Sequence, residues 1–148
     1  MLKIYLDTCC FNRPYDDQSL LRNSLEAQAV SHIQFLIRER HFLLASSYIL
    51  LFENSISPHV SRKTVIEGFI KKYSSTYIGV EHMVEIENTA QLVLESGVQS
   101  FDAYHIACAQ IACCNYFLTT DDKLLKYGLK NITIANPVDF LRMEVERQ

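Results

Sequence analysis

The stretch Leu2-Lys3-Ile4-Tyr5-Leu6-Asp7 decides the fold class, because it predicts a short β-strand that ends at a carboxylate. Leu2, Ile4 and Leu6 alternate with the residues between them, which is the periodicity of a strand. Segments with strand and helix patterns then alternate along the rest of the chain. We therefore predict an α/β protein whose parallel sheet is covered by helices on both faces.

The other elements follow from periodicity and turn signals. Further strands are expected at residues 41–45, 76–80, 116–119 and 132–135. Helices are expected at residues 19–39, 48–57, 62–73, 85–95, 101–114, 123–126 and 137–142. Residues 12–17 are expected to form a turn-like segment. In the first helix, the residues expected to face the core are Leu21, Leu25, Ala29, Ile33, Leu36 and Ile37. Since no repeat or linker interrupts the pattern, we expect residues 1–148 to form one domain.

Composition narrows the class of protein. The 148 residues are 49% hydrophobic and carry a formal net charge of −3. The apolar content suffices for a sizeable core, and the charge argues against nucleic-acid binding through bulk positive charge. No apolar run is long enough to span a bilayer. Met1-Leu2-Lys3 leads directly into the first strand, so we expect no signal peptide and a cytoplasmic protein without membrane association.

The five cysteines are unsuited to a disulfide framework. Their number is odd, they include two adjacent pairs, and their spacing is not that of a structural zinc site. We expect reduced thiols, most of them buried as small hydrophobic residues. Cys108 and Cys113 fall within a helix that is expected to be buried.

Four acidic residues, far apart in the sequence, are expected at one edge of the sheet. Asp7 ends the first strand, and Asp121 lies just beyond the strand at residues 116–119. Asp102 lies in the first turn of its helix, and Glu53 lies about two turns into the helix after the second strand. The carboxyl ends of parallel strands and the starts of the following helices meet at the same edge, so we expect these side chains to converge.

Two of these acids lie where a carboxylate is unfavourable. The helix around residues 103–113 is apolar on nearly every side and is expected to be buried, and Asp102 opens it. Glu53 shares the helix face of Ile49 and Ile56, which is expected to point inward. No lysine or arginine lies nearby on either helix to neutralise these acids. A buried, unpaired carboxylate is strongly unfavourable, and a bound cation would remove the problem.

Each acid also has an ordinary structural interpretation, and all four would have to apply together for the convergence to be accidental. Asp102 could be a first-turn acid that the helix dipole favours, and Asp121 or Asp122 could cap a helix. The Glu53 side chain could extend to solvent, and Asp7 could close a turn through residues 12–14.

Four short segments surround these acids in order and spread over most of the chain. They are Ile4-Tyr5-Leu6-Asp7-Thr8, Ser47-Tyr48-Ile49-Leu50-Leu51-Phe52-Glu53, Phe101-Asp102-Ala103-Tyr104-His105-Ile106-Ala107 and Phe117-Leu118-Thr119-Thr120-Asp121. Each segment is weak alone, but the ordered set resembles the PIN-domain family, the nuclease fold of VapC-like toxins and of several RNA-processing enzymes. The resemblance implies a PIN-like three-layer α/β/α fold with a parallel central sheet.

The resemblance also implies an activity. The chain would be a metal-dependent endoribonuclease that cleaves RNA by in-line attack of water and leaves a 5′-phosphate. Asp7, Glu53, Asp102 and Asp121 would be its metal ligands and catalytic acids. Ligands that offer only oxygen suit Mg²⁺ or Mn²⁺ better than zinc.

The segment around Asp121 is expected to orient the site. The resemblance implies this role for Thr119 or Thr120. The family's Thr-x-Asp pattern pairs Thr119 with Asp121, so Asp122 is the less favoured ligand.

Three further residues are candidates by their position. His105 follows Asp102 by three residues and projects near the same side, either as a hydrogen-bond partner of a ligand or as an ordinary core histidine. Arg13 and Lys123 adjoin the segments of Asp7 and Asp121, so both are candidates for phosphate contacts.

The expected partners are an RNA substrate, an antitoxin protein and, by resemblance, a second copy of the chain that uses the helix at residues 19–39 or 62–73. The segment at residues 9–18 is longer and more polar than the first loop of compact toxins, which puts the toxin role in question. The main alternative is a PIN-like module that binds RNA or protein without catalysis. A phosphotransferase with an aspartyl phosphate is less well supported, because Asp7-Thr8-Cys9 lacks a second acid two residues after the first.

Overall fold

Five parallel strands form the centre of the computed structural model, which describes residues 1–145. The strands are β1 (Lys3–Leu6), β2 (Leu43–Ser47), β3 (Ser74–Ile78), β4 (Tyr116–Leu118) and β5 (Thr133–Ala135). They lie in the order β3-β2-β1-β4-β5, and each neighbouring pair is parallel. The predicted parallel sheet is therefore confirmed.

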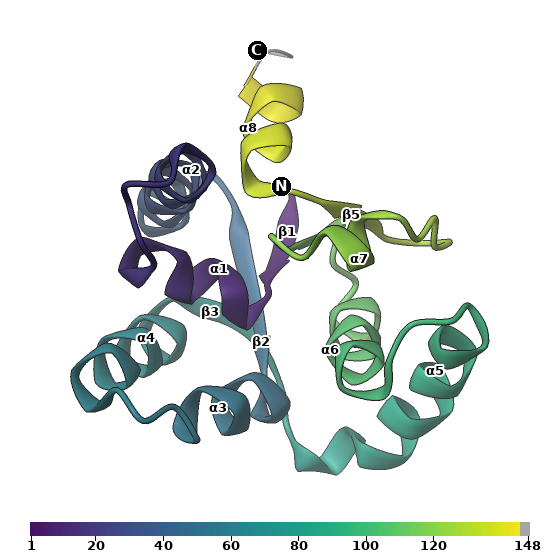
Figure 1. Cartoon of the computed structure of the whole chain (residues 1–148). Coiled ribbons are helices and arrows are strands. Elements are labelled where there is room, and N and C mark those ends of the chain that lie inside the picture. The colour runs from purple at the N-terminus through teal and green to yellow at the C-terminus, as the bar shows by residue number, and fades with distance from the viewer. Residues whose placement is uncertain (146–148) are drawn as a thin grey trace.

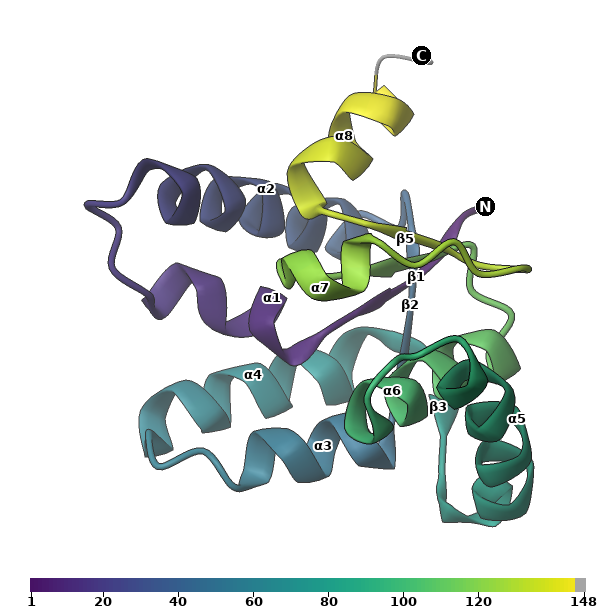
Figure 2. The same cartoon turned by 45° about the vertical axis from the view of Figure 1, so that its right-hand side comes forward.

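Helices cover both faces of this sheet (Figure 1). They are α1 (Thr8–Asn12), α2 (Leu21–Arg38), α3 (Tyr48–Ser55), α4 (Val60–Tyr73), α5 (Met83–Glu95), α6 (Ser100–Ile111), α7 (Asp122–Leu125) and α8 (Pro137–Val145). The connections from β1 to β2 and β3 place α1–α4 on one side, and the connection back to β4 places α5 and α6 on the other (Figures 1 and 2). This is the expected three-layer α/β/α arrangement. Within residues 1–145, every helix is too short or too polar to span a bilayer.

The central strand β1 is buried on both faces. Ile4 pairs with Leu44 of β2 on one side and with Tyr116 of β4 on the other. Tyr5, the next residue, is fully buried and stacks on Phe117 of β4, with 5.5 Å between the ring centroids. A buried tyrosine hydroxyl needs a hydrogen-bond partner, so this residue links the core to the polar groups described below.

The segment after β1 differs from the prediction. Residues 8–12 form α1 and Arg13–Tyr15 forms a 3₁₀ turn, where only a turn at residues 12–17 was expected. Asp7 caps α1, since its Oδ1 atom accepts a hydrogen bond from the Thr8 backbone N–H at 2.8 Å. A helix of five residues is too short for its periodicity to be seen in the sequence.

The inward face of α2 begins later than predicted. Leu21 and Leu25 are 72% and 47% exposed, whereas Glu26 is only 3% exposed. The prediction that Leu21 and Leu25 face the core was therefore wrong. Glu26 can be buried because Arg13 and Asn136, from other parts of the chain, bind its carboxylate.

The end of α6 also differs from the prediction. The helix ends at Ile111, and Cys113 adopts the left-handed conformation that is common after a helix, with φ of 59°. Cys113 is consequently exposed, so its expected burial was wrong, while Cys10, Cys108 and Cys114 are buried. All five cysteines are free thiols.

Candidate metal centre

The carboxyl ends of β1, β2 and β4 bring the candidate ligands to one edge of the sheet. Asp7 follows β1 directly, and its backbone N–H donates to the carbonyl of Leu118 at the end of β4, at 2.9 Å. Ser47 ends β2 and caps α3, because its Oγ atom accepts from the backbone N–H of Leu50 at 3.1 Å. This cap fixes the start of the helix that carries Glu53.

Asp7 is a buried carboxylate with a hydrogen-bond donor on each oxygen. It is 6% exposed. Its Oδ1 atom accepts from the Thr8 N–H, and its Oδ2 atom accepts from the Thr119 hydroxyl at 2.9 Å and from the Cys9 thiol at 3.4 Å. Burial raises the pKa of Asp7 well above its ordinary value, and nearby Cys9 and Glu53 add to the rise. The fold therefore holds a carboxyl group where its negative charge is unfavourable without a cation.

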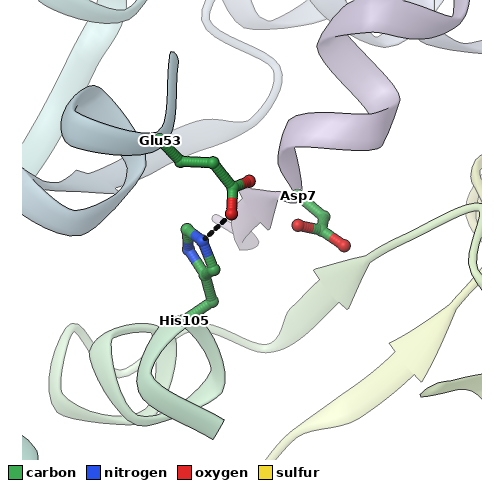
Figure 3. A group of neighbouring side chains, drawn as sticks. All are labelled: Asp7, Glu53 and His105. Atoms are coloured by element: carbon green, nitrogen blue, oxygen red, sulfur yellow. Dashed lines mark hydrogen bonds and ion pairs between the residues drawn. The ribbon is translucent and has the colours of Figure 1, made fainter. Parts of the chain in front are cut away.

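Glu53 and His105 form a cluster with Asp7. One oxygen of each acid and one ring nitrogen of His105 all lie within 4.8 Å of one another. Figure 3 shows the Glu53 carboxylate and the His105 ring pointing toward one another from α3 and α6, beside Asp7. His105 Nε2 lies 3.4 Å from Glu53 Oε2. Burial alone would raise the pKa of Glu53, but hydrogen bonding, above all from His105, outweighs it and lowers the pKa.

The expected inward face of α3 applies only to its first part. Ile49 is buried, and the Glu53 side chain is 25% exposed. Ile56 is 64% exposed, because α3 ends at Ser55 and the next residues leave the core. The expectation for Ile56 was therefore wrong, and Glu53 lies at the rim of the buried face.

Asp102 and Asp121 lie around this cluster without belonging to the 4.8 Å group found among the described residues. Asp102 is half-buried; burial first, and then the negative charge of Asp121, raise its pKa. Asp121 caps α7, because its Oδ1 atom accepts from the Lys123 N–H at 2.9 Å. This cap is one of the ordinary interpretations considered from the sequence. The Asp121 N–H also donates to the Thr119 hydroxyl oxygen at 3.1 Å, so Thr119 joins the segment of Asp121 to Asp7.

Thr120 and Asp122 have different surroundings from Thr119 and Asp121. Thr120 is buried; its N–H donates to Cys9 Sγ at 3.3 Å, and its carbonyl accepts from Arg22 at 2.7 Å. Asp122 is exposed and accepts two hydrogen bonds from the guanidinium of Arg22, at 2.8 and 2.9 Å. The carboxylate of Asp122 is therefore paired with a cation outside the cluster.

The two candidates for phosphate contacts also differ. The Arg13 side chain is 17% exposed and pairs with Asp16 at 3.0 Å and with Glu26 at 2.9 Å. Lys123 is exposed and lies next to Asp121 in the α7 cap. Its ammonium group is better placed than the Arg13 guanidinium to meet a phosphate from solvent.

The residues of the cluster fit a divalent cation. Asp7 and Glu53 supply carboxylate oxygens, the donors that Mg²⁺ and Mn²⁺ prefer. The Thr8 hydroxyl lies close to Glu53, and it is buried without a hydrogen-bond partner in the part of the chain that the structure describes. A buried hydroxyl of this kind beside two acids fits a hydrated cation, whose water would satisfy it.

Two residues that lie around the cluster, Ser47 and Tyr5, were not expected from the sequence to have a role at the site. Ser47 had a usable signal, because a serine directly before a helical pattern is a typical N-cap. Tyr5 had a weaker one, since a tyrosine inside a central strand must find a partner for its hydroxyl. Which partners they find depends on contacts between distant elements, and periodicity does not report those.

Among the residues that the structure describes, two surface hollows are lined by none of the four acids. One, of about 670 Å³, lies between α5 and residues 128–131. Another, of about 370 Å³, is an apolar groove whose lining includes Phe52 and Phe101. These two aromatic residues precede Glu53 and Asp102, so the groove opens beside the cluster.

Among the comparisons with known proteins, the one with solved structures finds a chain of similar fold. Neither models of protein families nor curated proteins match the chain. A similar solved structure is a chain from the crystal structure of VapBC2 from Rickettsia felis bound to a DNA fragment from their promoter. The TM-score is 0.56 at 14% sequence identity, over 91% of this chain and 98% of that chain. At this identity the likeness establishes the shared fold alone.

Proposed function

From the PIN-like fold that the chain has, we propose that it is a metal-dependent endoribonuclease. It hydrolyses phosphodiester bonds of RNA at Asp7, Glu53, Asp102 and Asp121, with Mg²⁺ or Mn²⁺ as the cofactor. The convergence of Asp7 and Glu53 from two distant segments carries this proposal. Two carboxylates about 4 Å apart repel by roughly 1 kcal/mol in water and by several times more at a lower effective dielectric. A divalent cation offsets this repulsion.

The residues of the site divide the work. A divalent cation at these acids supplies polarisation of the phosphate and lowers the pKa of the attacking water. Asp7 and Glu53 bind it, and the Thr119 hydroxyl holds Asp7 in place. Asp102 is suited to accept a proton from water, because burial and Asp121 raise its pKa.

Cleavage of single-stranded RNA by the purified protein tests the proposal. Cleavage should require Mn²⁺ or Mg²⁺ and should stop on chelation. Glu53→Gln, Asp102→Asn and Asp121→Asn should each slow it by roughly 100-fold or more, because each removes one member of a shared site. Asp122→Asn is the matched control, since its carboxylate is paired with Arg22, and it should lose much less. Cleavage by Asp102→Asn at the wild-type rate would overturn the assignment.

The proposal extends to partners and organisation. We propose one domain over residues 1–148, a cytoplasmic location, and an antitoxin protein as a partner. The similar structure is that of a VapBC2 complex, which supports the last point. A homodimer through α2 is supported by its exposed apolar residues Leu21, Leu25 and Phe35. Light scattering at micromolar protein should give twice the chain mass, and a monomer mass would contradict the dimer.

The competing function is a module that binds RNA without cleaving it. Such a module gains nothing from acids that repel a phosphate backbone. Its RNA binding should be independent of Mn²⁺ and should strengthen in Glu53→Gln, whereas the enzyme should lose cleavage in that variant.

A further inference from the structure

A series of hydrogen bonds joins Glu53 to Ser47, the N-cap residue of its own helix. The Ser47 hydroxyl lies 2.7 Å from the Tyr5 hydroxyl, which lies 2.9 Å from His105 Nδ1. On its other side, His105 Nε2 lies 3.4 Å from Glu53 Oε2. Ser47 is also the N-cap of α3, on which Glu53 lies. This series, called the relay below, therefore begins at the N-cap of α3, passes through β1 and α6, and ends at Glu53 on α3 itself.

The three linking groups are removed from solvent. Tyr5 and Ser47 are 0% exposed, and His105 is 1% exposed. Packing holds their positions, because the Tyr5 ring stacks on Phe117 and makes a T-shaped contact with the His105 ring, with 5.9 Å between the ring centroids. Polar groups in such a place depend on one another for their hydrogen bonds, which strengthens and orders the series.

Elementary chemistry sets the direction of each bond. An ionised Glu53 carboxylate can only accept, so His105 Nε2 must donate. In a neutral imidazole, Nδ1 is then an acceptor, and the Tyr5 hydroxyl donates to it. The Tyr5 oxygen in turn accepts from the Ser47 hydroxyl, whose oxygen accepts the Leu50 N–H. Every donor in the series thus has one acceptor.

We propose that Tyr5 and His105 are positioning residues, which fix the Nε2–H form of His105 and thereby aim the Glu53 carboxylate at Asp7. This inference rests on the proposed function, since it treats Glu53 as a metal ligand. His105 acts through Glu53 and is not itself required to touch substrate. Loss of a partner that orients a metal ligand typically lowers metal affinity or activity by about 10–100-fold.

The tautomer of His105 is the first test. A long-range ¹H–¹⁵N NMR spectrum of the metal-free, ¹⁵N-labelled protein distinguishes the Nε2–H form from the Nδ1–H form and from the imidazolium. We expect the Nε2–H form in the wild type and a mixture of forms in Tyr5→Phe. The imidazole signals that disappear in His105→Gln are thereby assigned to His105. A wild-type His105 in another form, or an unchanged spectrum in Tyr5→Phe, would overturn the relay.

Mn²⁺ affinity, measured by electron paramagnetic resonance, is the second test. His105→Leu should bind Mn²⁺ about 10–100-fold more weakly, and Tyr5→Phe should show a smaller loss. His105→Gln should recover much of the affinity, because its amide can still donate to Glu53. Tyr116→Phe is the matched control: it removes the hydroxyl of another buried tyrosine of the same sheet, which donates to Glu144 and not to the cluster.

The outcomes separate the relay from the proposed function. Wild-type affinity in Tyr5→Phe and in folded His105→Leu would overturn the relay while leaving the nuclease intact. If His105→Leu does not fold, Tyr5→Phe decides alone, since it keeps the ring that packs on Phe117. A wild-type protein that binds no Mn²⁺ would overturn the proposed function, and the NMR comparison would still decide the relay.

Discussion

The carboxyl group of Asp7 makes the stability of the metal-free protein depend on pH. Burial, and then Cys9 and Glu53, raise its pKa in the folded chain. An acid with a raised folded-state pKa contributes its full stability only below its ordinary pKa of about 3.9. That contribution is lost as the pH rises through the folded-state pKa. We therefore expect Asp7→Asn to increase the free energy of unfolding of metal-free protein by roughly 1 kcal/mol at neutral pH.

Urea unfolding of chelator-treated protein measures this effect. The advantage of Asp7→Asn should shrink as the pH falls through the raised folded-state pKa of Asp7, and it should be smallest below about 4, where the carboxyl is protonated in the folded and the unfolded chain alike. Asp122→Asn is the control, because its exposed carboxylate has a pKa lowered by the hydrogen bonds from Arg22 and should bring no such gain. An Asp7→Asn variant that is less stable than the wild type at neutral pH contradicts the argument.

The cysteines should differ in reactivity according to their exposure. Cys113 is exposed beyond the end of α6. Burial raises the pKa of Cys108 to about 11 and that of Cys114 to about 12, so few thiolates form at either residue. We expect Cys113 to react with a thiol reagent long before these two, and Cys113→Ser to remove its share of the fast phase. Cys9 contributes the rest, because hydrogen bonding, first from Cys10, lowers the pKa of Cys9 to about 5. Fewer than five thiols in denaturant would refute the expectation of a fully reduced protein.

The sequence indicated individual acids better than it indicated their surroundings. Asp7 and Glu53 were expected to converge because each follows a strand of a parallel sheet, and the structure does bring them together. Their role as metal ligands stays a prediction. The series from Ser47 through Tyr5 and His105 to Glu53 could not be predicted, because it depends on side-chain contacts between β1, β2, α3 and α6.

On the scale of elements, α2 is anchored through a buried acid. Glu26 pairs with Arg13, which follows α1, and accepts a hydrogen bond from Asn136, which precedes α8. Removing one partner of a buried ion pair typically costs about 3–5 kcal/mol, because the other charge is left without compensation. We expect a loss toward the lower end of this range in Glu26→Ala, because the Arg13 side chain is only 17% exposed but keeps its ion pair with Asp16.

Arg22→Ala is the comparison for Glu26→Ala. Arg22 also pairs with Glu26, at 3.3 Å, but its side chain is 49% exposed and its removal leaves Glu26 paired with Arg13. We expect a loss of only about 0–1 kcal/mol, which is what an exposed ion pair contributes. Urea unfolding should therefore rank Glu26→Ala well below Arg22→Ala in stability. Equal losses in the two variants would mean that the buried pair does not anchor α2.

The elements themselves could largely be located from the sequence. The amphipathic helix α5 has a clear period, and α6 and β4 can be recognised as apolar segments of helical and strand length. The exceptions have physical causes. Helix α1 is shorter than two turns, so it has no detectable period. Strand β2 extends to Ser47, and the sequence did not reveal this because the last residues of the strand are polar. The inward face of α2 was misjudged because a paired Glu26 replaces a leucine in the core.

On the scale of the molecule, the candidate ligands come from the end of β1, from α3, from α6 and from the start of α7. A cation that binds them connects both helical layers to the sheet, and it binds the folded chain in preference to the unfolded one. At a concentration 100 times its dissociation constant, such a ligand stabilises the fold by about 2.7 kcal/mol. For a domain of this size, that corresponds to a rise in Tm of roughly 5–10 °C.

We therefore expect Mn²⁺ to raise the Tm of the wild-type protein by this amount and chelation to reverse the rise. Asp7→Asn and Glu53→Gln should lose most of the rise, because the remaining acids no longer form one site. Tyr5→Phe should keep part of it, since a tenfold weaker affinity removes only about 1.4 kcal/mol. Asp122→Asn should keep all of it. An equal rise in Asp7→Asn would mean that Mn²⁺ binds elsewhere on a chain of net charge −3, and the shared site would then be excluded as the cause of stabilisation.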